Sequence, residues 1–106
     1  MKTLKAAVLD SAGDDYTGLW EVLWLVKQRR PEQTDSVARE QARSLVLEML
    51  HDRLLLLYEG VEFNGDEKRV QSSQWEQSLD VVTYWGEPLG DMQQMRVVAT
   101  EQGERE

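Results

Sequence analysis

The pattern of hydrophobic and polar positions predicts two helices near the start of the chain. In residues 3–9, apolar side chains recur at helical spacing, and Gly13 follows at a position where a helix would end. A second helix is predicted over residues 16–30. Residues 14–15, both aspartate, precede it where the helix dipole favours negative charge, and Pro31 ends it.

The second helix is almost entirely apolar, and a third helix follows it. Within residues 19–26 only Glu21 is polar, so this helix must be covered on more than one face. Residues 34–36 offer N-caps for a helix that runs to about residue 51. Its apolar stripe is the clearest periodic signal in the chain and consists of Ala38, Ala42, Leu45, Val46, Met49 and Leu50.

Two strands are predicted in the second half of the chain. Residues 54–58 form a continuous apolar run, which predicts a strand buried on both faces. Asn64 and Gly65 follow and predict a two-residue hairpin turn, because such turns need positive φ at both positions. Residues 95–100 are the predicted last strand.

The segment between these strands predicts a helix that covers the second face of the first strand. Ser73 and Glu76 have the spacing of a capping box, and apolar residues follow at helical intervals, so we expect a helix over residues 74–84. Residues 86–91 are expected to form a loop because of their glycine and proline content. The polar residues 102–106 are expected to fray.

The composition fits one small folded domain. The 106 residues, 41% hydrophobic and with two prolines, indicate a single domain over residues 1–106 with 98–106 as strand end and tail. Cysteine is absent, which excludes disulfides and thiolate metal sites and fits a cytoplasmic location. No run reaches the length of a membrane span. The apolar stretch of the N-terminus ends at Asp10, too early for a signal peptide, so we expect it to belong to the fold.

The charge is strongly negative and unevenly distributed. The formal net charge of −8 disfavours a general polyanion binder, since non-specific affinity for nucleic acids comes from cationic side chains. Residues 27–53 are nearly neutral, with six basic and five acidic side chains. Residues 54–106 hold four basic and eleven acidic side chains and would repel a phosphate backbone.

The predicted order of elements resembles that of winged helix-turn-helix domains: three helices, a strand, a turn-containing segment and a second strand that returns beside the first. Residues 40–56 resemble the passage in which the recognition helix runs into the first wing strand, with Arg53 where many members have glycine. Residues 97–103 resemble the strand and T-x-x-G ending common in bacterial winged-helix regulators. The expected class is therefore α+β: a three-helix winged-helix-like domain with a small antiparallel hairpin or sheet. Residues 73–91 look like an extra helix inserted between the wing strands.

The resemblance implies that the third helix enters a major groove of DNA with its exposed N-terminal residues. The residues expected to reach bases and phosphates are Thr34, Ser36, Arg39, Gln41 and Arg43, with Lys27, Arg29 and Arg30 nearby for phosphates. Lys68 and Arg69 are the cations near the expected wing tip, beside Asp66 and Glu67. The alternative is that all these charges cover a solvated surface and bind nothing.

The four tryptophans allow a different hypothesis. Trp20 and Trp24 lie four residues apart and therefore on one helix face. If Trp75 and Trp85 pack over them, all four belong to the core. If not, Trp20 and Trp24 form an exposed patch of the kind that marks partner sites. The winged-helix resemblance also implies that a homodimer can form.

Catalysis and metal binding have little support in the sequence. His51 is the single histidine and has no partner histidine at ligand spacing. We therefore expect no catalytic, cofactor-binding or metal site and no small-molecule ligand. The preferred expectation is a non-enzymatic, acidic protein-interaction module. The alternatives are a sequence-specific DNA-binding regulator that uses the third helix, and an acidic protein that neutralises a basic partner.

Overall fold

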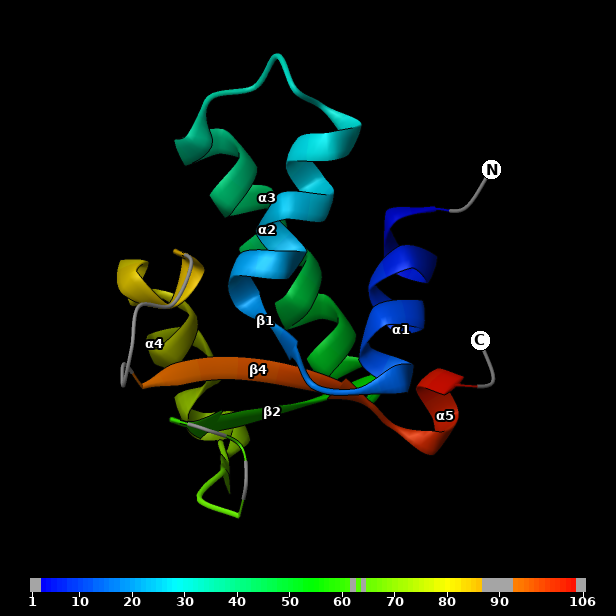
Figure 1. Cartoon of the computed structure of the whole chain (residues 1–106), viewed down its shortest axis with the longest axis vertical. Coiled ribbons are helices and arrows are strands. Elements are labelled where there is room, and N and C mark those ends of the chain that lie inside the picture. Colours follow the sequence, from blue (N-terminus) through cyan, green and yellow to red (C-terminus); the bar gives the residue numbers. More distant parts are fainter. Residues whose placement is uncertain (1–2, 62, 64, 87–92, 105–106) are drawn as a thin grey trace.

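Three helices stand on one face of an antiparallel sheet (Figure 1). The computed structural model describes residues 3–61, 63, 65–86 and 93–104. The elements within these residues are, in chain order, α1 (Leu4–Asp14), β1 (Thr17–Gly18), α2 (Leu19–Arg29), α3 (Asp35–His51), β2 (Leu55–Gly60), β3 (Lys68–Arg69), the 3-10 turn η1 (Ser72–Gln74), α4 (Trp75–Leu79), the 3-10 turn η2 (Val82–Trp85), β4 (Gln94–Ala99) and α5 (Glu101–Glu104). The fold is therefore mixed α+β, which agrees with the expected class.

The last strand lies inside the sheet, whose order is β1-β4-β2-β3. β4 pairs with β2 over all six residues of each strand. On its other side β4 pairs with β1, where Thr17 lies opposite Val97. β3 has two residues and pairs with Tyr58 and Glu59 of β2. The two strands expected from the sequence are confirmed, and they are neighbours.

The two faces of the sheet are buried to different degrees. Leu55, Leu57 and Val97 are buried beneath the helices, whereas Leu56 and Tyr58 on the opposite face are half-buried. The prediction that the β2 strand is buried on both faces is therefore only half right. The segment expected to cover the second face contacts the helices instead, α4 against α3 and η2 against α2.

The boundary between the first two helices differs from the prediction. α1 continues through Gly13, and Asp15 follows its end, with Oδ1 accepting a hydrogen bond from the Tyr16 amide (2.7 Å). Residues 17–18 pair with β4, so α2 begins only at Leu19. Asp14 is thus the last residue of the first helix and Asp15 follows it, and neither caps the second helix, whose N-cap is Gly18. The pairing with β4 explains the difference, because it provides backbone hydrogen bonds that local helical spacing does not reveal.

The third helix is confirmed. The Thr34 hydroxyl oxygen accepts a hydrogen bond from the Val37 amide (3.3 Å) and so caps α3. Of the predicted apolar stripe, five residues are buried and Leu45 is half-buried.

The end of α3 is stabilised by two backbone hydrogen bonds. The Leu54 amide donates to the Met49 carbonyl (2.9 Å), and the Arg53 amide donates to the Leu50 carbonyl (3.1 Å). These two bonds form a Schellman motif, whose turning residue takes a left-handed conformation. Arg53 occupies that position with φ of 63°. Glycine suits the same backbone conformation without a steric penalty.

The helix predicted over residues 74–84 is broken into short pieces. Trp85 Nε1 donates to the Leu79 carbonyl (2.8 Å), the acceptor that the Thr83 amide would need in a continuous α-helix. α4 therefore ends at Leu79, and η2 begins at Val82. The predicted capping box is also wrong, because Ser73 lies within η1 and no side-chain hydrogen bond caps α4.

The turn after β2 is longer than the predicted two-residue hairpin. β2 ends at Gly60 and β3 begins at Lys68. Gly65 has the expected positive φ of 109°, and Asn64 lies outside the described residues. Asp66 Oδ2 accepts a hydrogen bond from the Val61 amide (2.6 Å), so a side chain links the two ends of the loop.

The predicted fraying tail is partly ordered. Residues 101–104 form α5, and the Gly103 amide donates to the Thr100 hydroxyl oxygen (2.9 Å). Gly103 is buried so close to the Leu54 carbonyl that a Cβ atom would collide with it. Residues 105–106, like most of the loop expected at 86–91, lie outside the described residues.

Candidate functional site

The four tryptophans divide between the core and the surface. Trp85 is 3% exposed and belongs to the core, whereas Trp24 is 55% exposed. Trp20 and Trp75 are half-buried. The expectation that all four tryptophans pack in the core is therefore met by Trp85 alone. η2 brings Trp85 into the core but leaves Trp24 uncovered on α2.

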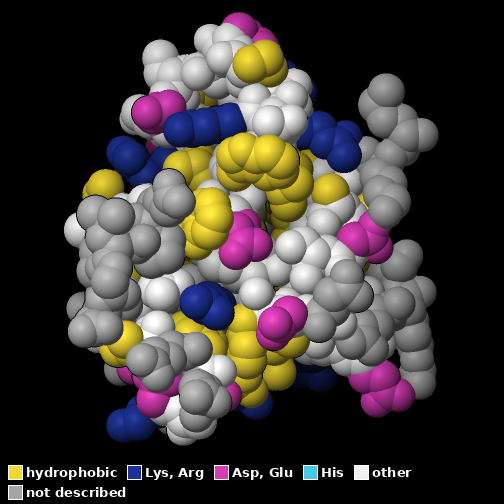
Figure 2. Space-filling model, in the orientation of Figure 1, with side chains coloured by type: hydrophobic (Ala, Val, Ile, Leu, Met, Phe, Trp, Pro, Cys, Tyr) yellow, Lys and Arg dark blue, Asp and Glu magenta, His cyan; other side chains and the backbone are white. Residues whose placement is uncertain are grey.

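Trp24 borders a hollow of about 280 Å³ between α1 and α2. Its lining residues are Ser11, Trp20, Glu21, Trp24 and Leu25, and we refer to it as the tryptophan hollow. In Figure 2, hydrophobic side chains gather over α2 in the centre of the face shown, with an acidic side chain among them. The surface predicted from Trp20 and Trp24 thus also includes the carboxylate of Glu21 and, from α1, Ser11.

Gly18 sets the position of the Trp20 ring. A Cβ atom at Gly18 would lie 2.8 Å from both Cδ1 and Nε1 of Trp20 and 3.7 Å from Glu21 Oε1. The indole and the carboxylate therefore both lie beside the backbone of Gly18, in space that a side chain at this position would occupy. The sequence pattern did not reveal this arrangement, because it placed Gly18 within a longer predicted helix.

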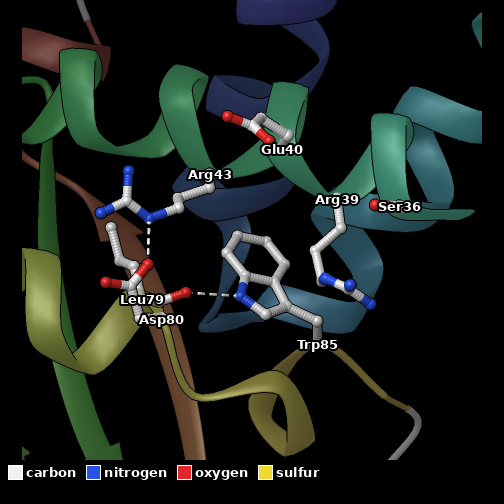
Figure 3. Close-up of a pocket in the computed structure, with 7 residues that line it drawn as sticks. All are labelled: Ser36, Arg39, Glu40, Arg43, Leu79, Asp80 and Trp85. Atoms are coloured by element: carbon white, nitrogen blue, oxygen red, sulfur yellow. Dashed lines mark hydrogen bonds and ion pairs between the residues drawn. The ribbon is translucent and has the colours of Figure 1, made fainter.

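The expected DNA-contacting arginines lie beside the 72–86 segment (Figure 3). Arg43 Nε contacts Asp80 Oδ1 at 2.7 Å, and the Trp85 ring lies between Arg39 and Arg43. Ser36 lines the same pocket, of about 310 Å³. The structure thus brings three of the expected contact residues together, but it places an acidic residue and a core tryptophan against them.

The side of α3 that faces solvent is acidic. A shallow depression of about 520 Å³ is lined by Glu40, Gln41, Ser44, Leu45 and Glu48. Gln41 therefore lies between two carboxylates and away from Arg39 and Arg43. Thr34, another expected contact, already uses its hydroxyl oxygen to cap the helix.

The basic cluster at the end of α2 is partly engaged within the protein. Lys27 Nζ lies 2.9 Å from Asp35 Oδ1, and the hydrogen bond and positive charge of Lys27 hold the pKa of Asp35 below its ordinary value. Arg29 donates to the Thr3 carbonyl (3.5 Å), and Arg30 is exposed. This ion pair joins the start of α3 to the end of α2.

No family model, curated protein or solved structure matches this chain. Its function is therefore inferred from its own surfaces.

A second aromatic group lies on the half-buried face of the sheet. The Tyr16 ring meets those of Tyr58 and Phe63 edge-on, at centroid distances of 5.5 and 5.0 Å. The Arg96 guanidinium lies 4.4 Å from the centre of the Phe63 ring. Burial and the nearby Glu67 carboxylate raise the pKa of Tyr16. The sequence interpretation missed this group, since its members come from four separate segments.

The expected wing cations are exposed on β3. Arg69 lines a hollow of about 590 Å³ that also includes Trp75. His51 stacks edge-on against Trp75, with ring centroids 5.2 Å apart.

Among the residues described, no group of three or more His, Cys, Asp or Glu side chains could hold a metal ion. Over the same part of the chain, no helix has both the length and the apolar character needed to cross a membrane.

Proposed function

We propose that the protein is a non-enzymatic protein-interaction module of winged-helix type that meets its partner through the tryptophan hollow. The observation that carries this proposal is the 55% exposure of Trp24. Tryptophan is among the residues that contribute most to binding at protein interfaces, because it buries a large rigid surface at low entropic cost. Leu25 and Trp20 extend the apolar surface around it.

Two features support the winged-helix part of the proposal. α1, α2 and α3 precede β2, and β4 returns beside β2 after an excursion, which is the order on which the resemblance rests. Arg53 also has the left-handed backbone that glycine would favour at this place.

Partner capture from the native cell at low salt tests the proposal. We expect wild-type protein to retain a specific protein and Trp24→Ala to lose it. Val82→Ala is the control, since Val82 is 58% exposed but lies on η2, outside the hollow. Equal retention by Trp24→Ala would contradict the proposal. Light scattering decides whether the retained partner is a second copy of the chain.

The second candidate is sequence-specific DNA binding through α3. Ser36 and Arg39 favour it, because they line one pocket near the start of that helix. The Arg43–Asp80 pair and the outward-facing Glu40 and Glu48 disfavour it. Selection from random duplexes tests this candidate. If a target is found, Arg39→Glu should abolish binding, and unchanged affinity would remove α3 from the interface.

A further inference from the structure

The tryptophan hollow combines aromatic surface with a negative charge. Two of its lining residues are tryptophans, Glu21 contributes a carboxylate and Ser11 a hydroxyl group. No lysine or arginine is among its described lining residues. Aromatic faces attract cations through the ring quadrupole, and a neighbouring carboxylate adds direct charge attraction.

The net charge of the sequence around the hollow also favours a cation. Residues 1–26 hold two lysines and four acidic residues, so this part of the chain is negative, as is the whole molecule. Lys27 follows Trp24 by three residues, but its ammonium group lies 2.9 Å from Asp35. The nearest base in the sequence is thus already paired with an acid on the neighbouring helix.

We infer that the tryptophan hollow binds a lysine or arginine side chain in a basic segment of another protein. The cationic group lies against Trp20 and Trp24 and pairs with the Glu21 carboxylate. An anionic group would be repelled by Glu21. A purely apolar side chain would bury this carboxylate without a partner, which is costly. This inference rests on the proposed function and specifies the chemistry of the partner.

The position of Glu21 makes the inference specific. Its carboxylate and the Trp20 indole both lie beside Gly18 and line the same hollow, so one incoming cation can contact both groups. Trp24 lies one helical turn further along α2, on the same face. The geometry requires only one long basic side chain, presented by a segment that extends along α1 and α2.

Nuclear magnetic resonance of the indole groups tests the inference. The ¹⁵N-labelled protein is titrated with a soluble decapeptide of alternating lysine and glycine, and a peptide of alternating glutamate and glycine serves as the comparison. We expect the lysine peptide to shift the Nε1–H signals of Trp20 and Trp24 and to leave that of buried Trp85 in place. The glutamate peptide should shift none of them.

Two charge variants separate a local site from general attraction. Glu21→Gln and Glu48→Gln each remove one negative charge, but Glu48 lies on α3 outside the hollow. We expect Glu21→Gln to weaken peptide binding about fivefold or more and Glu48→Gln to leave it within about twofold, because close pairs outweigh screened distant charges. Trp24→Leu keeps an apolar side chain without the ring and should also weaken binding.

The outcomes are distinct. Equal weakening by both glutamine variants, or no indole shift at millimolar peptide, would overturn the inference. If the peptide fails to bind while Trp24→Ala still loses the cellular partner, the proposed protein-interaction function is supported, and the inference that the partner presents a basic segment is wrong. If the peptide binds at the hollow but Trp24→Ala keeps its cellular partner, the proposed function fails on its own test.

Discussion

At the scale of single residues, two tryptophans of the same chain have opposite surroundings. Trp85 is buried, and its indole nitrogen satisfies the Leu79 carbonyl. Trp24 is mostly exposed and lines a hollow that no described part of the chain fills. The first therefore stabilises the fold, whereas the second is available for binding.

Alanine substitution should separate these two roles. Trp85→Ala leaves a cavity and an unpaired buried carbonyl, so we expect it to lower the free energy of unfolding by about 3–5 kcal/mol. Trp24→Ala should change it by about 0.5 kcal/mol or less, as is usual for surface positions. Urea denaturation measures both values. Similar losses in the two variants would show that Trp24 is part of the core.

Arg53 provides a second prediction at this scale, because a non-glycine residue pays a steric penalty at positive φ. Arg53→Gly removes this penalty but gives the unfolded chain more freedom, so the expected net gain in unfolding free energy is about 0.5–1 kcal/mol. Thermal and urea denaturation measure the gain. A loss of stability would mean that the Arg53 side chain stabilises the folded state by more than the steric penalty of its positive φ destabilises it.

At the scale of elements, the contacts between helices decide which basic residues are free. Lys27 links α2 to Asp35 of α3, and Arg43 links α3 to Asp80 after α4. Both pairs are largely exposed, so each contributes little to stability. Their main consequence is to fix where these side chains point, and thus to reduce the positive charge that α3 presents to a ligand.

The Asp35 pKa reports the link between α2 and α3. Carboxyl chemical shifts followed against pH should show an Asp35 pKa below its ordinary value of 3.8. The stabilisation is present above the unfolded-state pKa and is lost as the pH falls through the lower folded-state pKa. Lys27→Met should raise the Asp35 pKa, whereas Lys68→Met, on β3, should not. An unchanged Asp35 pKa in Lys27→Met would show that the pair does not form in solution.

The elements that could be predicted from the sequence are those fixed by local chemistry. α3 has its cap and its apolar stripe within its own residues, so its bounds followed from the pattern. β1 depends on pairing with β4 near the other end of the chain, and the break after Leu79 depends on the Trp85 indole.

At the candidate site, the four-residue spacing of Trp20 and Trp24 predicted that both side chains lie on one face of α2. The contribution of Glu21 depended on the packing over Gly18, which the pattern does not encode.

At the scale of the whole molecule, the negative charge and the exposed aromatic surface lie in different parts of the sequence. Most of the net charge of −8 comes after residue 53, whereas the tryptophan hollow belongs to α1 and α2. The negative charge of the second half can therefore attract a basic protein over a distance, while the tryptophan hollow provides the surface that contacts it.

Fluorescence quenching of the intact protein tests how many tryptophans are open to solvent. Acrylamide should quench a substantial fraction of the wild-type emission, because Trp24 is exposed, and the accessible fraction should fall in Trp24→Phe. Trp85→Phe is the matched control and should raise this fraction, because it removes a buried emitter that the quencher does not reach. Emission that is fully blue-shifted and insensitive to the quencher in a proven monomer would contradict an exposed Trp24.

The central position of β4 also bears on how the protein folds during synthesis. β1 and β2 are made early, but each needs β4 between them to complete its hydrogen bonds. A ribosome must therefore release residues up to 99 before the sheet can close, whereas α2 and α3, which follow each other in the chain and pack together, can form beforehand. Nascent chains stalled before β4 emerges should be helical and sensitive to protease.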